Sequence, residues 1–481
     1  MLTYSVNKYI IIIAVTRRKI MNFDDFFGTM YGKTVSIIGL GVSNMPLMRL
    51  MVKYGATVTG FDKKDSEHIA PSVKEELFHQ MVPCVLGENY LENIQADYIF
   101  RSPGIRPDLK EFQEAVKNGA VLTSEMELFM KLCPCKVIGI TGSDGKTTTT
   151  TIIAEMLKKQ GKTVHIGGNI GAPLLSKIPD MKEDDYAVVE LSSFQLMTMD
   201  NSPDISVITN IAPNHLDVHK DMDEYVAAKE NIFVHQDENG LSVFNFNCPY
   251  TEEQLKKAKG KTRLFSPHKA LENGVCCDDE WIYIMQDGQR ENLIKRSDVK
   301  LVGFHNIENY MAAAAALYGI VSKENMTAVA KEFGGVEHRI EFVRELDGVK
   351  YYNDSIASSP TRTIAGFHSF NQKVILIAGG SDKHIPFDGL AEEITDHVKA
   401  LFLVGHTAEA IKSAVLSAKG YDAEKLPIEI FPNLKEAVNA ARNIAKPGDI
   451  VTLSPACASF DLYKNFMERG NIFKDIVNNL K

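Results

Sequence analysis

The sequence predicts an α/β protein of three domains, each built on a mainly parallel sheet. Three observations support this fold class. Apolar, strand-like runs alternate with helical patterns along the chain. Glycine-rich turns follow directly after two of these runs, as is common where a parallel strand leads into a helix. The length of 481 residues exceeds what one core usually holds and suits three units of roughly 100–200 residues.

The strand-like runs fall into three groups in chain order. The first contains TVSIIGLG (34–41), TVTGFD (57–62) and ADYIFRS (96–102). The second begins at Lys136 and contains YAVVEL (186–191), ISVITNI (205–211) and the helical run HNIENYMAAAAALYGI (305–320). The third contains VKYYNDS (349–355), KVILIAGG (373–380), ALFLVG (400–405) and DIVTLSPA (449–456).

These groups predict the domain limits. We expect a Rossmann-like N-terminal domain over residues 31–132 and a central P-loop mononucleotide-binding domain over 133–334. A C-terminal Rossmann-like domain should follow over 335–481. Residues 1–30 read as a loosely ordered leader, unless Met21 is the true start; the sequence leaves both possibilities open.

Composition and charge exclude several classes of protein. Hydrophobic residues make up 44% and charged residues 24%, which is ordinary for a globular chain. The net charge of −9 argues against general nucleic-acid binding. The apolar run 9–15 is too short to span a bilayer, and its basic cluster lies on the wrong side for a signal peptide. Seven scattered cysteines without a C-x-x-C pair predict a reducing, cytoplasmic location and no zinc site.

A phosphate-binding loop is the clearest motif of the chain. In VIGITGSDGKTTTTTIIAEMLKK (137–159), an apolar strand leads through Gly142 and Gly145 to Lys146 and Thr147 at the start of a helix. The two glycines lie closer together than in G-x-x-x-x-G-K-[ST]. Free backbone N–H groups and the helix dipole favour an anion here, Lys146 suits the β- and γ-phosphates, and the Thr147 hydroxyl suits Mg²⁺. The alternative is a glycine-rich turn that only caps a helix.

Further polar residues follow the ends of neighbouring strands. Glu190 closes the run AVVE, where parallel sheets bind ligands, and could be a second Mg²⁺ ligand or a solvated strand end. His215, Asp217 and His219 cluster after the run 205–211, although a single histidine is more often structural. Lys229 lies in a helical pattern and by itself reads as surface.

The first group carries an imperfect dinucleotide motif. Gly39-Leu40-Gly41 is followed by Asn44 where the third glycine should stand, and Asp62 closes the next strand. An NAD-dependent dehydrogenase would be a fair interpretation of this segment alone, but such a motif is weak evidence.

Ten motifs in order connect the chain to one family. They are TGSDGKTT, GGNIG, ELSSFQL, NHLDVH, EYVAAKENIF, GFHNIENYMAAAAA, EHRIE, YYNDSIASSP, AGGSDK and LSPACASFD. With these motifs the chain resembles the Mur ligase family, whose members share the shortened loop T-G-[ST]-[ND]-G-K-[TS]. The resemblance covers about residues 22–481. Folylpolyglutamate synthetases share the loop but would not need the first unit.

The resemblance implies an ATP-dependent amide ligase of cytoplasmic peptidoglycan precursor synthesis. The γ-phosphate of ATP would go to a substrate carboxylate, an amine would attack the acyl phosphate, and a tetrahedral intermediate would lose phosphate. The motifs agree best with members that add D-glutamate to UDP-N-acetylmuramoyl-L-alanine. ATP and two Mg²⁺ ions are implied as cofactors, with small molecules as the partners, no nucleic acid or membrane, and a monomeric chain.

The family match also implies roles for individual residues. The implied catalytic residues are Lys146, Glu190, His215 and Lys229, and the metal ligands are Thr147, Glu190, His215 and, if carbamylated, Lys229. The implied ATP-binding residues are Gly142, Ser143, Asp144, Gly145, Lys146, Thr147, Thr148, Asn306, Asn309, His338, Arg339 and Asp354. Those for the UDP substrate are Val42, Ser43, Asp62, Lys63, Ser102, Gly104, Asn169 and His215. Those for D-glutamate are Ser358, Lys383, Ser454 and Phe460.

Three positions depart from the family pattern, and alternative functions therefore stay possible. Ile356 stands where many D-glutamate ligases have Lys, Ser358 replaces a common Thr, and Val218 replaces a common Arg. The nearest rival is a sister ligase that adds L-alanine, L-lysine or diaminopimelate, although no Asn-Pro-Arg-type signature is present. A non-catalytic nucleotide-binding regulator is a rival of a different class.

Overall fold

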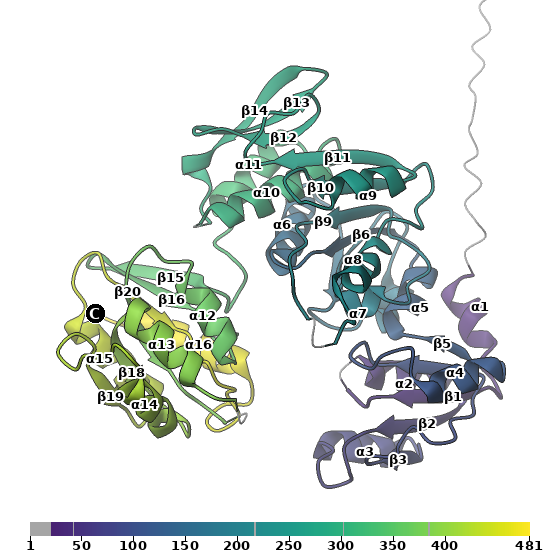
Figure 1. Cartoon of the computed structure of the whole chain (residues 1–481). Coiled ribbons are helices and arrows are strands. Elements are labelled where there is room, and N and C mark those ends of the chain that lie inside the picture. Colours follow the sequence, from purple (N-terminus) through teal and green to yellow (C-terminus); the bar gives the residue numbers. More distant parts are fainter. Residues whose placement is uncertain (1–20, 42, 216–217, 302, 383–384) are drawn as a thin grey trace, which may run out of the picture. The chain divides into compact units, whose positions relative to one another are not determined.

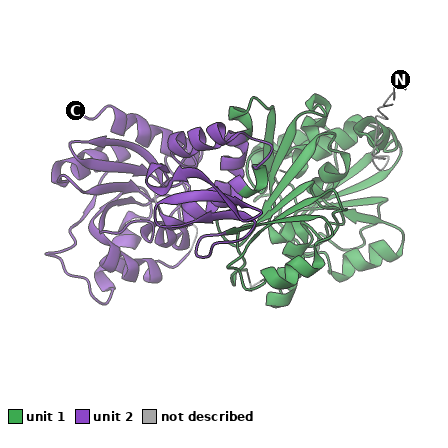
Figure 2. Cartoon of the chain, turned by 90° about the horizontal axis from the view of Figure 1, so that it is seen from above, with its two compact units in different colours: residues 1–146, 157–265, 315–317 green, residues 147–156, 266–314, 318–481 purple. Residues whose placement is uncertain are grey.

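The computed structural model describes residues 21–41, 43–215, 218–301, 303–382 and 385–481 (Figure 1). The chain divides into two compact units (Figure 2). Unit 1 comprises residues 1–146, 157–265 and 315–317, and unit 2 comprises residues 147–156, 266–314 and 318–481. These limits cross the predicted domain boundaries, which therefore stay a prediction. None of the described helices has the length and apolar character needed to cross a bilayer.

Unit 1 begins with a five-stranded parallel sheet, as the first group of runs predicts. Its order is β3(Cys84–Leu86), β2(Thr57–Asp62), β1(Thr34–Ile38), β4(Tyr98–Arg101), β5(Val121–Thr123). The central strands are largely buried because helices cover the sheet. The helices of this segment are α2(Asn44–Lys53), α3(Pro71–His79), α4(Lys110–Lys117) and α5(Glu125–Leu132).

A short helix precedes this sheet within the stretch expected to be a loose leader. Helix α1(Phe23–Gly28) is capped by Asn22, whose side chain accepts from the Asp25 amide at 2.8 Å. Phe27 and Met30 are fully buried in the hydrophobic core. Residues 22–30 are therefore packed against the first sheet.

A second parallel sheet of unit 1 carries the phosphate loop. Its order is β11(Lys261–Ser266), β10(Leu241–Asn245), β9(Ile205–Ile208), β6(Lys136–Thr141), β8(Tyr186–Glu190), β7(Val164–Gly168). Strands β6, β8 and β9 are almost wholly buried, which explains their continuous apolar runs. The associated helices are α6(Lys146–Lys159), η1(Leu175–Asp180), α7(Ser193–Leu196), α8(Met222–Glu230) and α9(Thr251–Lys257).

Unit 2 contains an antiparallel meander that the sequence did not predict. Strands β12(Gly274–Cys277), β13(Trp281–Gln286) and β14(Gln289–Lys295) pair in order and lead through η2(Arg296–Asp298) to α10(Phe304–Leu317) and α11(Lys323–Glu332). Helix α10 is the predicted alanine-rich helix, and its alanines are fully buried.

The third sheet, also in unit 2, contains every strand-like run of the third group. Its order is β15(Glu341–Leu346), β16(Val349–Asn353), β20(Ile450–Leu453), β17(Val374–Ala378), β18(Val398–Leu403), β19(Ile428–Ile430). Only the edge strand β15 is antiparallel to its neighbour. The helices are α12(Pro360–Phe367), α13(Asp388–His397), α14(Ala408–Ser417), α15(Leu434–Ile444) and α16(Phe466–Asn478).

Candidate active site

The phosphate loop joins β6 to α6 and needs both of its glycines. Gly142 and Gly145 have positive φ values of 154° and 77°, which side chains rarely adopt. A Cβ on Gly142 would also lie 1.9 Å from Thr209 Oγ1. The loop is therefore a tight turn into a helix N-terminus, as the motif predicts. Thr147 and Thr148 lie in the first turn of α6 and are half-buried.

Asn210, which follows β9, holds the loop and was not predicted as a site residue. Its Oδ1 accepts from the backbone N–H groups of Ser143 and Asp144 at 3.1 and 2.9 Å. The Ser143 hydroxyl donates to the Ala212 carbonyl at 2.8 Å and lies 3.0 Å from the Tyr225 hydroxyl. The position of Asn210 after an apolar strand was the available signal, because neighbouring parallel strands end at one edge.

Two lysines meet at one carbonyl oxygen beneath the loop. The oxygen of Gly142 accepts from Lys146 Nζ at 3.0 Å and from Lys229 Nζ at 2.7 Å. Lys229 is 1% exposed and lies over the Tyr225 ring, so the interpretation of this lysine as surface is wrong. Burial, and then the charge of Lys146, hold the pKa of Lys229 well below its usual value. A buried amine that favours its neutral form is a nucleophile rather than a simple cation.

Glu190 lies at the carboxyl end of β8, beside the end of β7. Its carboxylate is 2% exposed and accepts from Asn169 Nδ2 at 2.8 Å. The Asn169 backbone N–H also donates to the Glu190 carbonyl at 2.8 Å. The solvated-strand-end interpretation is therefore wrong, and two predicted site residues lie in contact.

The two histidines after β9 have different surroundings. His215 is exposed, has a φ of 55°, and its ring lies 5.2 Å from the Phe194 ring. His219 is buried, stacks on the Phe194 ring with the centroids 5.2 Å apart, and its Nε2 lies 2.9 Å from the Ser193 hydroxyl. Burial lowers the pKa of His219. His219 thus packs inside against Phe194 and Ser193, whereas His215 is exposed; Asp217 lies outside the described residues.

The glycine-rich turn of the first sheet is closed by polar side chains. Asn44, in place of the third glycine, is buried and donates through Nδ2 to the carbonyls of Ile38 and Gly39 at 3.1 and 2.9 Å. The same amide lies 3.2 Å from Ser102 Oγ, and the Leu40 backbone N–H donates to Asp62 at 2.9 Å. The turn lies at the β1/β4 switch point, where open α/β sheets bind ligands.

The other residues predicted for the UDP substrate surround this turn in sequence. Ser43 is half-buried and precedes α2, whereas Lys63 and Gly104 are exposed. Val42 lies outside the described residues. The structure therefore brings Asp62, Ser102 and the Gly39 turn together. Asn44, which stands in place of the third glycine of the motif, is part of the same cluster.

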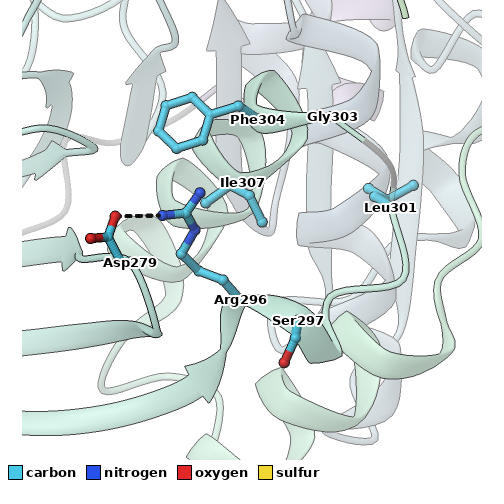
Figure 3. Close-up of a pocket in the computed structure, with 7 residues that line it drawn as sticks. All are labelled: Asp279, Arg296, Ser297, Leu301, Gly303, Phe304 and Ile307. Atoms are coloured by element: carbon cyan, nitrogen blue, oxygen red, sulfur yellow. Dashed lines mark ion pairs between the residues drawn. The ribbon is translucent and has the colours of Figure 1, made fainter. Parts of the chain in front are cut away.

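The asparagines of α10 contact each other and helix α6. Asn309 donates to Asn306 Oδ1 at 3.1 Å and accepts from the Thr149 hydroxyl at 3.3 Å. An open pocket of about 330 Å³ lies beside this helix start (Figure 3). It is lined by Asp279, Arg296, Ser297, Leu301, Gly303, Phe304 and Ile307, none of which was predicted. Figure 3 shows the Arg296 guanidinium between the Asp279 carboxylate and the Phe304 ring.

In the third sheet, one predicted ATP residue contacts one predicted D-glutamate residue. The buried Ser454 hydroxyl donates to Asp354 Oδ2 at 2.8 Å and lies 3.0 Å from the Thr363 hydroxyl. Burial raises the pKa of Asp354 to about 7, against the lowering effect of the Ser454 hydrogen bond. Ser358 is half-buried, and Phe460 is 73% exposed. Lys383 lies outside the described residues.

The predicted ATP-facing pair is divided by burial. His338 has a φ of 65°, is 3% exposed and lies 2.9 Å from Asn353 Nδ2, whereas Arg339 is exposed. Burial lowers the pKa of His338. Arg339 thus presents a charge to the surface, and His338 packs inside the unit.

Two arginines lie next to the positions that depart from the family pattern. Arg362, on α12, donates to the Ile356 carbonyl at 3.3 Å, so a cation lies near the position where Lys is missing. Arg106 donates to the Val218 carbonyl at 2.7 Å and pairs with Glu224. Neither arginine was predicted as a site residue.

The donor set at the loop fits Mg²⁺ and a nucleotide. Mg²⁺ prefers oxygen ligands, and the Glu190 carboxylate at the end of β8 is one. The Asn169 contact fixes the Glu190 carboxylate in place. The positive-φ glycines and the start of α6 provide the backbone N–H groups and dipole that suit phosphates.

Comparisons with known proteins show which family the chain is similar to. Three family models match: a MurD-like N-terminal domain of Mur ligases at residues 33–124, the Mur ligase middle domain at 140–317, and the glutamate ligase domain at 338–457. A UDP-N-acetylmuramoylalanine–D-glutamate ligase of Clostridium botulinum is 52% identical over 460 residues, or 95% of this chain and 99% of the relative. One of Clostridium acetobutylicum is 49% identical over 465 residues, or 96% and 99%.

Solved structures show the same fold at low identity. MurF from Acinetobacter baumannii has a TM-score of 0.56 at 16% identity and covers 93% of this chain and 91% of its own. The UDP-N-acetylmuramate–alanine ligase of Thermotoga maritima has a TM-score of 0.53 at 17% identity, with 93% and 100% covered. The 52% identity to a clostridial enzyme over nearly its full length, together with the three matching family models, shows that the chain belongs to the Mur ligase family.

Proposed function

We propose that this chain is the ATP-dependent ligase that joins D-glutamate to UDP-N-acetylmuramoyl-L-alanine. The observation that carries the proposal is 52% identity to a D-glutamate ligase over 99% of that relative's length. The shortened phosphate loop, with Lys146, Lys229 and Glu190 around it, supports the same reaction. This assignment also places the chain among the cytoplasmic enzymes of peptidoglycan precursor synthesis.

The reaction must activate a carboxylate, which is a poor electrophile because of its negative charge. Lys146 would neutralise the γ-phosphate as it moves to the carboxylate, leaving ADP and an acyl phosphate. The amine of D-glutamate then attacks the acyl carbon, and the tetrahedral intermediate loses phosphate to leave the amide. The protein contributes orientation and charge stabilisation.

Magnesium supplies further positive charge at the transferring phosphoryl group when it is bound. Thr147 and Glu190 would hold one ion, and His215 would belong to a second site. Asn169 keeps the Glu190 carboxylate in one orientation at 2.8 Å. The number of ions and the role of His215 remain predictions.

Lys229 suits carbamylation, which needs a neutral amine to react with CO₂. Burial lowers its pKa in that direction, and the product would be a carboxylate-like metal ligand. We expect turnover to fall in CO₂-free buffer and to recover with bicarbonate. An unchanged rate after exhaustive CO₂ removal would argue against the modification.

The two Rossmann-like sheets would bind the other substrates. The turn closed by Asn44 and Ser102 suits the UDP portion, together with Val42, Ser43, Asp62, Lys63 and Gly104. Asn306 and Asn309, which contact each other on α10, would bind the adenine, with Arg339 and Asp354 as further ATP residues. Ser358, Lys383, Ser454 and Phe460 would bind D-glutamate.

The first experiment is phosphate release from ATP and Mg²⁺ with UDP-N-acetylmuramoyl-L-alanine. D-glutamate, L-glutamate, L-lysine and diaminopimelate are tested separately. Release only with D-glutamate supports the proposal, and release only with another amino acid moves the specificity to a sister ligase. Light scattering on the same sample tests the predicted monomer.

Replacing Lys146 by Ala separates an enzyme from a nucleotide-binding regulator. We expect kcat to fall on the order of 10²–10³-fold or more, because the cation at the transferring phosphate is lost. Lys162→Ala is the matched control, since Lys162 is exposed just after the same helix. Equal turnover in both variants would contradict the role of Lys146.

A further inference from the structure

Two helices of the third sheet bring together three metal-binding side chains, none of which is used above. His368 caps the C-terminal end of α12, and Glu393 and His397 lie one turn apart at the end of α13. One ligand atom of each residue lies within 4.8 Å of the other two. His368 is exposed, and the other two side chains are partly exposed, so solvent reaches the cluster.

Packing holds the cluster in this arrangement. The buried Phe367 ring stacks on the His397 ring, with centroids 5.9 Å apart and planes 21° from parallel. The His368 ring meets the same imidazole edge-on at 5.1 Å. A ring fixed by an aromatic neighbour loses little side-chain entropy when it takes a ligand.

The distances suit a tetrahedral ion after small rotations. Ligands at about 2.0–2.1 Å from Zn²⁺ lie roughly 3.3 Å from each other at the tetrahedral angle. His397 Nε2 and Glu393 Oε2 are already 3.3 Å apart. Only the exposed His368 has to approach, within the 4.8 Å that now bounds the cluster.

The local field also favours a cation. Both histidines lie at helix C-termini, where the macrodipole is negative. The Glu393 carboxylate adds a full negative charge. One cation competes nearby, because Lys373 Nζ donates to the Thr395 carbonyl at 2.9 Å, at the same end of α13.

We propose that His368, Glu393 and His397 bind one divalent transition-metal ion, with Zn²⁺ as the preferred ion and water completing its coordination. Two imidazoles and a carboxylate are a zinc donor set, whereas Mg²⁺ prefers oxygen ligands alone. The expectation of no zinc site rested on cysteine spacing and did not consider this cluster. The ion would tie the end of α12 to the end of α13.

The test is a zinc titration of the metal-free full-length chain with Mg²⁺ in excess and a competing chelator. We expect one Zn²⁺ per chain in the wild type. His397→Gln and His368→Gln should each weaken binding more than about tenfold, because loss of even an outer-shell partner costs 10–100-fold. His79→Gln is the matched control, since Glu75 and His79 form the same one-turn pair on α3, 3.7 Å apart.

A second measurement distinguishes this site from the cysteine pair. Cys133 and Cys135 are buried with their sulfurs 3.5 Å apart and could take zinc instead. Co²⁺ at the proposed site should show ligand-field bands without sulfur charge transfer. Zinc should also raise the Tm of the wild type and of His79→Gln, but not of His397→Gln.

Zinc binding that survives both histidine substitutions, a sulfur charge-transfer band, or no binding by the wild type would each overturn the proposal. Equal Tm values of the variants without zinc check that they fold. Because the cluster uses no residue of the proposed active site, this result stands or falls separately from the ligase activity.

Discussion

Glu125 is a buried carboxyl group whose protonation depends on its surroundings in the folded chain. Glu125, at the start of α5, is 5% exposed and accepts from the Leu175 backbone N–H at 3.0 Å. Burial raises its pKa to about 7, although backbone hydrogen bonds partly oppose the shift. A buried acid with a raised pKa binds its proton more tightly in the folded state than in the unfolded state, so it weakens folding as pH rises.

The prediction concerns the difference in unfolding free energy between Glu125→Gln and the wild type. Below pH 4.5 both states are protonated and the difference is constant; as pH rises from about 4.5 to 7 the wild type loses stability relative to the variant. The change should reach about 2–3 kcal/mol between pH 4.5 and pH 7.5. Urea unfolding at the two pH values measures it. Glu114→Gln, which is 59% exposed, is the control, and a difference that is flat for Glu125→Gln would contradict the prediction.

Arg362 is the residue that we expect to replace the missing pocket lysine. It extends from α12 to the Ile356 carbonyl at 3.3 Å, near Ser358 in the chain. A dicarboxylate substrate gains charge-assisted hydrogen bonds from a guanidinium. Arg362→Ala should raise the KM for D-glutamate about tenfold or more, as the loss of one such bond predicts, with little change in the KM for ATP. Equal changes in both KM values would point to a structural role.

The motifs predicted the chemistry of single residues better than their surroundings. Glu190 and Asn169 lie together because each stands at the end of one of two adjacent parallel strands. The sequence shows both positions at the ends of strand-like runs. Asn44 and Asn210 were missed because each acts through backbone groups of a turn whose shape is visible only in three dimensions. Likewise, nothing in the spacing of Lys229 indicated burial, since that depends on how α8 packs beneath the loop.

At the scale of elements, the strands were predicted where both faces are buried. The run of β17 is apolar throughout, and those of β8 and β20 are nearly so, because these strands are buried within their sheets. Strand β14 of the meander is exposed over its first four residues and has no continuous apolar run, so its sequence does not indicate a buried strand. Helix α1 was assigned to a leader because six residues give too short a periodic pattern.

Helix α1 makes a stability prediction of its own. Phe27 is fully buried, and its ring centroid lies 4.4 Å from that of Phe23 and 5.1 Å from that of Tyr54. Phe27→Ala should lower the free energy of unfolding by about 3–5 kcal/mol, because it removes an aromatic side chain from a closed core. Phe78→Ala, at 81% exposure on α3, should cost less than about 0.5 kcal/mol. Urea titration compares them, and equal midpoints would show that α1 is loosely attached.

At the scale of the whole molecule, the proposed reaction requires residues from separate sheets to act on one intermediate. Lys146 follows β6 of the second sheet, and Ser358 and Ser454 belong to the third. The chain passes between these sheets through Gly334 and Gly335, before β15 begins at Glu341. We therefore expect a hinge at these glycines, and compaction when ATP and both substrates are present.

The two glycines provide a matched test of that hinge. Gly335 has a φ of 116°, which an alanine adopts only with strain of about 1–3 kcal/mol. A Cβ on Gly334 would make only ordinary contacts at 3.6 Å with Lys300. Gly335→Ala should therefore lower kcat several-fold and change the compaction seen by small-angle scattering with a non-hydrolysable ATP analogue, while Gly334→Ala stays close to the wild type. Identical kcat and scattering for the two variants would place the hinge elsewhere, and absence of compaction in the wild type would remove it altogether.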